Sequence, residues 1–205
     1  KVVEENAMSK EESQYLSNYL LENNIPADFE CSNGIYATQY TKDTMLKMVE
    51  EQCAGKSEEE KAKHGLTILT NQVTVVDNIK DLVFNKVSVI DNGKTPYKKI
   101  QQDLSDKYDV IPATFAPLGK ESGEITSYHI NKAIGMDAVV KYFNADIKDT
   151  IAIGDGFNDL PMFEKAHLSI AMGNAPQEIK DKADRITTSL DDDGIYHAFK
   201  ELNLI

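Results

Sequence analysis

Residues 150–163 read T-I-A-I-G-D-G-F-N-D-L-P-M-F, and this stretch decides how the chain is expected to fold. The apolar run at residues 151–153 predicts a short buried strand. A glycine ends the strand, and an apolar pattern with a proline in its first turn, where proline is tolerated, predicts the start of a helix. Between them lie three side chains that carry oxygen atoms: Asp155, Asn158 and Asp159.

These oxygen-bearing side chains form a candidate metal site. In an open α/β sheet, ligands bind outside the carboxyl ends of the strands. A carboxylate at that place, such as Asp155, can face a hard cation such as Mg2+, which takes oxygen ligands. Asp and Asn are also common turn and helix-cap residues, but their clustering where the sheet would end favours the functional interpretation.

A dinucleotide-binding loop is a distant alternative for the same stretch. Gly154 and Gly156 give the pattern G-x-G. Asp159 stands where the third glycine of a dinucleotide fingerprint would be, and its charge would repel a pyrophosphate.

The motif G-D-G-F-N-D-L-P-M-F resembles the fourth motif of the haloacid dehalogenase (HAD) superfamily, most closely that of its Cof-type phosphatases, which carry a large α/β cap. The resemblance is strong in order and spacing over residues 124–205, and before them it is one of pattern rather than motif. It implies an α/β fold: a HAD-like Rossmannoid core, of which this chain holds the second half, with an α+β cap domain.

The resemblance also implies roles for four side chains. Lys132, within the Asn-Lys-Ala of residues 131–133, would be the lysine of the third motif, which holds the phosphoryl group and offsets charge in the transition state. Asp155 would be a Mg2+ ligand, and Asn158 would contact the phosphate side of the substrate. Asp159 would orient Lys132 or the waters of the metal.

Two further residues are candidates near this site. Gly156 would let the backbone pass close to the metal. Asn174, in the next loop, either contacts the site or caps the helix predicted from Pro176, and the sequence supports both interpretations equally.

The chain departs from the family pattern at the nucleophile. In the family, an aspartate attacks phosphorus, a phospho-aspartate forms, and a second aspartate two residues on handles protons. Both belong to a D-x-D-G-T motif, which is absent from these 205 residues. The acidic run at residues 191–194 resembles the family's late D-G-V loop instead, and no Ser or Thr can be assigned to the second motif.

We therefore expect the parent protein to be a Mg2+-dependent phosphatase acting on small phosphorylated metabolites, and this chain alone to have no turnover. The alternative is a non-catalytic binding or scaffold protein that kept the fold without the nucleophile. A third interpretation, the phosphorylation domain of a cation-transporting ATPase, shares a G-D-G-x-N-D motif. It is disfavoured by the cap-like first half and by the lack of any apolar run of membrane-span length.

The order of predicted elements divides the chain into residues 1–118 and residues 119–205. The first part predicts an α+β unit with a mostly antiparallel sheet, which fits the cap. From Asn131, which is expected to cap a helix, helices and strands alternate and predict a parallel layer. The boundary is expected in the polar turn near residues 117–124.

Several local predictions concern the first part. Ser9 and Glu12 form a capping box for a helix. A second helix is expected to start at Thr41, and a third to have Thr95 as N-cap and Pro96 as its first residue. The stretch at residues 66–76 is ambiguous between strand and helix.

The charge balance limits the possible partners. The chain has 22 Lys and Arg against 34 Asp and Glu, a net charge of −12. This argues against nonspecific binding to nucleic acid or to an anionic membrane. The two cysteines, Cys31 and Cys53, show no disulfide pattern and suggest a reducing, cytoplasmic compartment. The sequence makes no prediction of oligomeric state.

Overall fold

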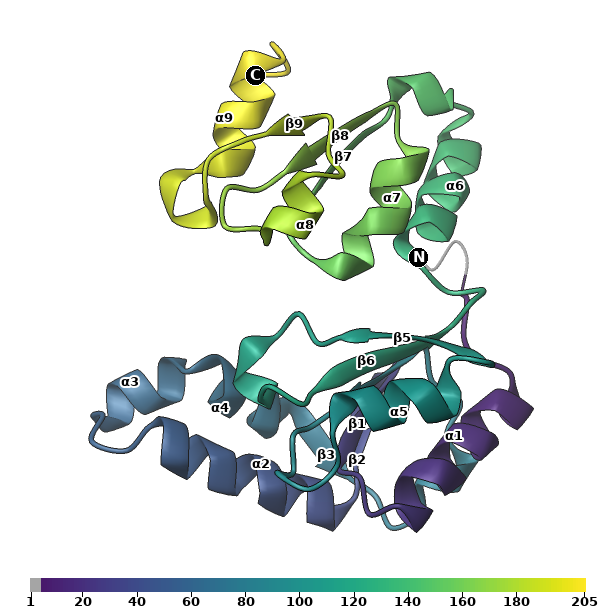
Figure 1. Ribbon diagram of the computed structural model, residues 1–205, viewed down its shortest axis with the longest axis vertical. Coiled ribbons are helices and arrows are strands. Elements are labelled where there is room, and N and C mark those ends of the chain that lie inside the picture. Colours follow the sequence, from purple (N-terminus) through teal and green to yellow (C-terminus); the bar gives the residue numbers. More distant parts are fainter. Residues whose placement is uncertain (1–4) are drawn as a thin grey trace. The chain divides into compact units, whose positions relative to one another are not determined.

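A computed structural model describes residues 5–205, and the chain divides into two compact units, Lys1–Ile130 and Asn131–Ile205 (Figure 1). The division falls later than the expected boundary between residues 118 and 119. The reason is that strand β6 (Gly123–Ser127) pairs with β4 (Lys86–Val89) on one side and β5 (Tyr108–Pro112) on the other, so the polar turn before it lies inside the first unit.

The first unit is built on a six-stranded sheet with the order β3-β2-β1-β4-β6-β5. Every neighbouring pair is antiparallel except β2 with β3, as the prediction of a mostly antiparallel sheet requires. Its other strands are β1 (Ala27–Cys31), β2 (Gly34–Ala37), β3 (Val73–Val75), β4 (Lys86–Val89) and β5 (Tyr108–Pro112).

One face of this sheet carries the larger apolar core of the unit. Phe29 pairs with Val87, Val87 with Ile125, and Ile125 with Val110, so their side chains form a row on that face. The row is buried with residues of α1 (Lys10–Glu22) and α5 (Tyr97–Leu104). The predicted capping box of Ser9 and Glu12 at the start of α1 is confirmed.

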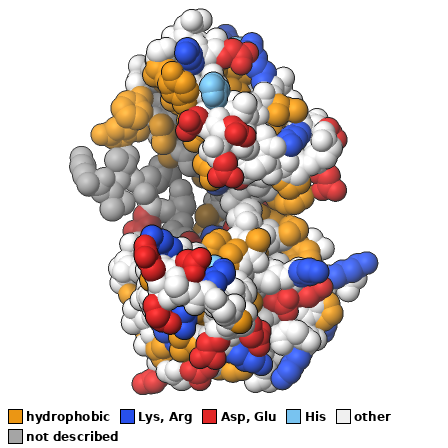
Figure 2. All heavy atoms as spheres, turned by 90° about the vertical axis from the view of Figure 1, so that its left-hand side faces the viewer, with side chains coloured by type: hydrophobic (Ala, Val, Ile, Leu, Met, Phe, Trp, Pro, Cys, Tyr) orange, Lys and Arg blue, Asp and Glu red, His pale blue; other side chains and the backbone are white. Residues whose placement is uncertain are grey.

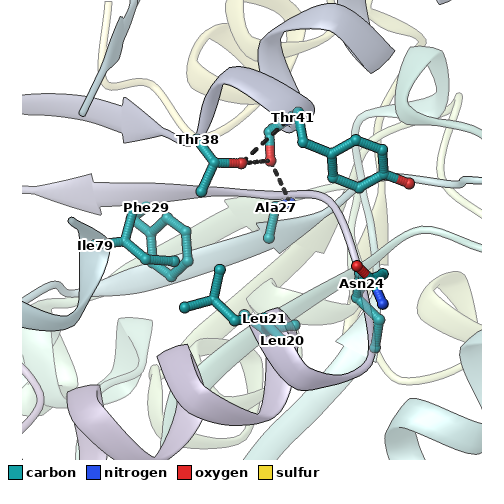
Figure 3. A pocket seen from close by; sticks show the side chains of 10 residues that line it. Leu20, Leu21, Asn24, Ala27, Phe29, Thr38, Thr41 and Ile79 are labelled. Atoms are coloured by element: carbon teal, nitrogen blue, oxygen red, sulfur yellow. Dashed lines mark hydrogen bonds between the residues drawn. The ribbon is translucent and has the colours of Figure 1, made fainter. Parts of the chain in front are cut away.

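The second helix, α2 (Gln39–Gln52), begins earlier than predicted because Thr38, not Thr41, is its N-cap. The Thr38 hydroxyl accepts from the Thr41 backbone N–H at 3.2 Å. Thr41 is buried inside the helix, and its Oγ1 accepts from the backbone N–H of Ala27 at 3.2 Å, which fastens α2 to β1 (Figure 3).

The ambiguous stretch at residues 66–76 contains both kinds of element. It forms α4 (Gly65–Gln72) and continues directly into β3. Leu66 is buried in a second apolar cluster, which includes Met45 of α2 and Ile90 after β4. The remaining short helices of this unit are α3 (Glu58–Lys63), η1 (Ile79–Asp81) and η2 (Ala116–Leu118).

The cap of α5 differs from the prediction. Pro96 itself occupies the N-cap position and offers no side-chain hydrogen bond. The carboxylate of Glu121, which comes from the turn before β6, accepts from the Tyr97 backbone N–H at 2.7 Å. The free N–H at the helix start is therefore satisfied by a residue distant in sequence.

The second unit is built on the parallel sheet β7-β8-β9, as the alternation of elements predicts. Its strands are β7 (Ile151–Gly154), β8 (Leu168–Ala171) and β9 (Arg185–Ile186). Its helices are α6 (Lys132–Phe143), η3 (Ile147–Asp149), η4 (Phe157–Asp159), α7 (Leu160–Lys165), α8 (Gln177–Lys180), η5 (Leu190–Asp192) and α9 (Gly194–Glu201).

The region around the fourth motif follows its predicted order of strand, turn and helix. β7 is followed by a 3-10 turn at η4 and then by α7, which has Pro161 in its first turn as predicted. Residues 152, 163, 171, 175 and 179 form the small core of this unit. α6 lies beside α7 and is joined to it by an ion pair of 2.5 Å between Lys165 Nζ and Asp137 Oδ2 (Figure 1).

Charged side chains of both signs are interspersed on the face drawn in Figure 2, without a single large patch of one sign. Among residues 5–205, no helix has both the length and the apolar composition that crossing a bilayer requires.

Candidate active site

A single buried carboxyl organises the end of β7. Asp159 is 3% exposed, and its Oδ1 pairs with the ammonium of Lys132. Its Oδ2 accepts from the backbone N–H groups of Asp155 at 2.9 Å and Gly156 at 3.0 Å. Hydrogen bonds to an ionised acceptor are stronger than neutral ones. Asp159 therefore joins the start of α6 to the loop that follows β7.

The glycine at the end of β7 makes room for this carboxyl. A Cβ placed on Gly154 would lie 2.3 Å from both Cγ and Oδ2 of Asp159. Any larger residue would force Asp159 out of its position. The glycine that breaks the strand in the sequence is thus required by space, because the motif's own acid folds back over the strand end.

Lys132 is the first residue of α6, and Asn131 caps that helix as predicted, with its Oδ1 accepting from the Ile134 backbone N–H at 3.0 Å. Its side chain is 48% exposed. A lysine ammonium has three donor hydrogens, so contact with one carboxyl leaves others for a ligand. The sequence alone did not establish on which side of the sheet this helix starts, and the structure brings it to the carboxyl end of β7.

Asp155 is exposed directly after β7. Its Oδ2 accepts from Asn174 Nδ2 at 2.8 Å, while no residue of the described range donates to its Oδ1. Asn174 Oδ1 in turn accepts from the Leu190 backbone N–H at 3.0 Å. The N-cap of α8 is Pro176, with no side-chain cap. Of the two interpretations of Asn174, contact with the site is therefore the one that the structure supports.

Two glycines bring the acidic loop of residues 188–194 close to Asn174. The Gly173 N–H donates to the Thr188 carbonyl at 2.9 Å, and a Cβ on Gly173 would lie 2.6 Å from the Ser189 nitrogen. A Cβ on Gly194 would lie 2.2 Å from the Thr188 oxygen. This close packing positions the Leu190 N–H that holds the Asn174 side chain.

Asn158 lies in η4 and is half-buried. Its side-chain amide forms no hydrogen bond with another of the described residues, so it is free to bond a ligand. Its assignment as a phosphate contact stays a prediction.

The donor set fits one particular kind of metal site. Within residues 5–205, no group of three or more His, Cys, Asp or Glu side chains is arranged to hold a metal ion. Mg2+ keeps several of its waters and is usually held by one or two carboxylates together with substrate phosphates. The unengaged Oδ1 of Asp155 fits that mode of binding, and the site does not fit a metal enclosed by protein ligands alone.

Comparison with known proteins supports the resemblance read from the motifs. The model for haloacid dehalogenase-like hydrolases matches residues 1–199 of this chain. Phosphatase YwpJ of Bacillus subtilis is 34% identical over 89 residues, which are 43% of this chain and 31% of that protein. The same organism's 5-amino-6-(5-phospho-D-ribitylamino)uracil phosphatase YitU is 33% identical over 134 residues, which are 64% of this chain and 50% of that protein.

The fold has solved counterparts as well. A haloacid dehalogenase-like hydrolase from B. subtilis superimposes with a TM-score of 0.78 at 19% identity, over 98% of this chain and 74% of that one. At this identity the likeness concerns the fold. The matched segments span half or less of the two curated phosphatases. Since the family model covers nearly all of the 205 residues, the chain belongs to the haloacid dehalogenase-like hydrolases.

Proposed function

We propose that the parent protein is a Mg2+-dependent phosphatase of the Cof type that hydrolyses small phosphorylated metabolites, and that this chain supplies the part of the site that holds the metal and the phosphate. The observation that carries the proposal is the shared carboxyl of Asp159, which binds the Lys132 ammonium through one oxygen and the Asp155 backbone through the other. Asp159 thus connects Lys132 and Asp155 by direct contacts, although these two residues come from different elements.

Each side chain has a distinct task in this proposal. Lys132 donates to a phosphate oxygen and offsets the charge that builds up on the phosphoryl group. Asp159, which is nearly buried, positions Lys132 and fixes the loop that carries Asp155. Asn158 offers its amide to the phosphate side of the substrate. Bound Mg2+, held by Asp155 with Asn174 orienting the carboxylate, would draw negative charge from the phosphate oxygens.

The chain offers no candidate for the attacking aspartate, because its 205 residues contain no D-x-D-G-T motif. We therefore propose that it binds phosphate and Mg2+ without turnover. The two cysteines of the chain form no disulfide, which is consistent with the proposal of a reducing, cytoplasmic compartment.

The same absence favours the second candidate, a non-catalytic HAD-fold binding or scaffold protein. The coding sequence immediately upstream of Lys1 discriminates between the two. A D-x-D-G-T motif there supports the phosphatase, and an upstream reading frame without one supports the binding protein.

Binding of inorganic phosphate in the presence of Mg2+, followed by calorimetry, tests the proposed site. We expect Lys132→Met to weaken phosphate binding about tenfold, since a hydrogen bond to a charged group contributes about 1.5–3 kcal/mol. Lys141→Met is the matched control, because Lys141 is an exposed lysine in the last turn of the same helix. Equal phosphate affinities of the wild type and both variants would show that Lys132 does not bind the phosphate.

Turnover is tested separately with p-nitrophenyl phosphate and Mg2+. We expect none from a chain confirmed to begin at Lys1. Robust hydrolysis that Asp155→Asn abolishes would refute the claim that the chain lacks a nucleophile, while leaving the metal assignment intact.

A further inference from the structure

The second face of the six-stranded sheet carries polar side chains in register. Asp28 of β1 pairs with Ser88 of β4, and Ser88 pairs with Glu124 of β6. Glu30 and Lys86 pair in the same way two residues along. Residues that pair across antiparallel strands lie on the same face, as do residues two apart in one strand. Three carboxyls and one ammonium therefore gather on the face opposite the row that contains Phe29.

Other elements border this polar face, and together they line an open pocket of about 280 Å3. Gly65, Ile68 and Leu69 of α4 line one side, and Phe115 and Leu118 line another. The absence of a side chain on Gly65 allows this approach, since a Cβ there would lie 2.9 Å from Cζ of Phe115. The cavity thus joins a charged floor to an apolar wall.

Two of the three carboxyls are already satisfied. Lys86 Nζ lies 2.9 Å from Glu30 Oε1 and 3.5 Å from Glu124 Oε2. Glu124 Oε1 also accepts from Thr114 at both its backbone N–H, 3.1 Å away, and its hydroxyl, 2.7 Å away. This part of the cavity floor is a completed ion-pair network.

Asp28 is the exception. Its side chain is 1% exposed, and neither of its oxygens has a hydrogen-bond partner among the described residues. The Ser88 hydroxyl, its neighbour in the register, lowers the pKa of Asp28 as a hydrogen-bond donor would, but the two groups lie outside ordinary hydrogen-bond geometry. A buried polar group without a partner costs stability, and native proteins rarely leave one unexplained.

Burial and nearby charges both shift the pKa of the Asp28 carboxyl. Burial, followed by the negative charge of Glu30, raises the pKa of Asp28 to about 7, against the opposing effect of Lys86. Burial lowers the pKa of Lys86, but its hydrogen bond to Glu30 and the charges of Glu124 and Asp28 raise it by more. The ammonium of Lys86 therefore stays charged, and it is committed to Glu30 and Glu124.

We infer that this cavity binds a small organic cation, a primary ammonium on a short apolar chain, with the ammonium donating to Asp28 and the apolar part lying against Phe115 and Leu118. A positive ligand is favoured because three carboxyls face one lysine. A donor with N–H groups is favoured because both Asp28 oxygens lack one. A bare metal ion is disfavoured, since none of the described clusters has the arrangement of a metal site. This inference does not depend on the chemistry proposed at Asp155.

A second pocket of the first unit differs from this one because it contains no unpartnered carboxyl. That pocket, about 160 Å3, lies between α1, β1 and α2 and is lined mainly by apolar side chains (Figure 3). Its two threonine hydroxyls, on Thr38 and Thr41, lie 3.1 Å apart and bond to each other, and Thr41 also bonds to Ala27. Both threonine hydroxyls are thus already hydrogen-bonded, and no carboxyl lines this pocket.

The test is a titration of the 205-residue chain with n-butylammonium chloride at pH 8, where most Asp28 carboxyls are ionised. Amide NMR signals of Ser88, Thr114 and Phe115 report on the cavity. We expect saturable shifts with n-butylammonium and about tenfold weaker binding of 1-butanol, which has the same shape but no charge. Tetramethylammonium, which is charged but has no N–H donor, should also bind about tenfold more weakly.

Asp28→Asn should weaken n-butylammonium binding about tenfold, and Glu30→Gln should weaken it less, because Glu30 already holds Lys86. The carboxyl signal of Asp28 gives a second measurement that needs no variant: its titration midpoint should fall when n-butylammonium is added. The inference is overturned if 1-butanol binds as well as n-butylammonium, if the Asp28 midpoint does not move, or if no saturation is seen by about 100 mM.

Discussion

Lys132 and Asp159 are 27 residues apart in the sequence, yet the ammonium of one meets the carboxyl of the other at the end of β7. The two partners are unequally placed: the Lys132 side chain is 48% exposed and that of Asp159 is 4% exposed. Their contributions to folding and to ligand binding should therefore differ.

We predict that Asp159→Asn destabilises the second unit by about 1–3 kcal/mol, because the backbone N–H groups of Asp155 and Gly156 lose a charged acceptor. Lys132→Met should cost less, since Asp159 keeps its two backbone N–H donors when the ammonium is removed. A urea titration followed by the amide signals of Asp155 and Gly156 measures both. A larger loss for Lys132→Met than for Asp159→Asn would show that the pair, rather than the loop, holds this region.

The second prediction concerns Gly154. A methyl group there meets the Asp159 carboxyl at 2.3 Å, so Gly154→Ala should destabilise the second unit by about 1–3 kcal/mol and displace Asp159. Gly135→Ala in α6 is the matched control, because a Cβ at Gly135 meets nothing within 4 Å. This control should stabilise the unit by up to about 1 kcal/mol through helix propensity. Equal effects of both variants on urea unfolding would contradict the close approach seen at Gly154.

The third prediction uses the contact between Asn174 and Asp155. Asn174→Asp places a second carboxylate beside Asp155, which should strengthen Mn2+ binding about tenfold, since added ligand charge favours a hard divalent cation. Asp155→Asn should weaken it by at least about tenfold. Mn2+ broadens nearby NMR signals, so the broadening of the Gly156 and Leu190 amides measures the affinity. Unchanged broadening in both variants would place the cation elsewhere.

Motif spacing and alternation predicted the parallel strands of the second unit, the start of α6 at its Asn131 cap, and the α+β character of the first unit. The sequence could not predict contacts between distant segments. Nothing near Tyr97 indicates that its N–H is capped by Glu121, and nothing near Gly65 indicates that Phe115 packs against it. The domain boundary was misplaced for the same reason, since only pairing across the sheet shows that β6 belongs to the first unit.

The candidate site likewise has a part that the sequence predicted and a part that only the structure shows. Asp155 and Asp159 were predicted from one short motif, and the contact of Asp159 with Lys132 was one of two roles expected for it. The role of Asn174 stayed open because helix capping and site contact use the same side chain. The sequence does not distinguish Asp28, because its neighbours Ala27 and Phe29 fit an ordinary alternating strand. Only the pairing with Ser88 and the burial of both oxygens distinguish it.

The fourth prediction concerns the pH dependence of stability that Asp28 creates. Burial and the nearby charge of Glu30 raise its pKa from 3.8 to about 7 in the folded chain. Between these values the folded state keeps a proton that the unfolded state has lost, so this group's contribution to the unfolding free energy falls as the pH rises and levels off above about 7. Asp28→Asn should remove the effect and make the first unit more stable at pH 8 by up to a few kcal/mol.

Asp103→Asn provides a control of opposite sign. Hydrogen bonds from Lys99, at 2.6 Å, and Tyr19, at 2.8 Å, lower the pKa of Asp103. The stability that Asp103 contributes is therefore present at neutral pH and is lost as the pH falls through the acidic range. Urea unfolding of the first unit at a series of pH values distinguishes the two carboxyls. The difference in unfolding free energy between Asp28→Asn and the wild type should grow from pH 4 to pH 7. The corresponding difference for Asp103→Asn should shrink below about pH 4. A difference for Asp28→Asn that does not change with pH would mean that its carboxyl titrates normally and is neither buried nor unpartnered in solution.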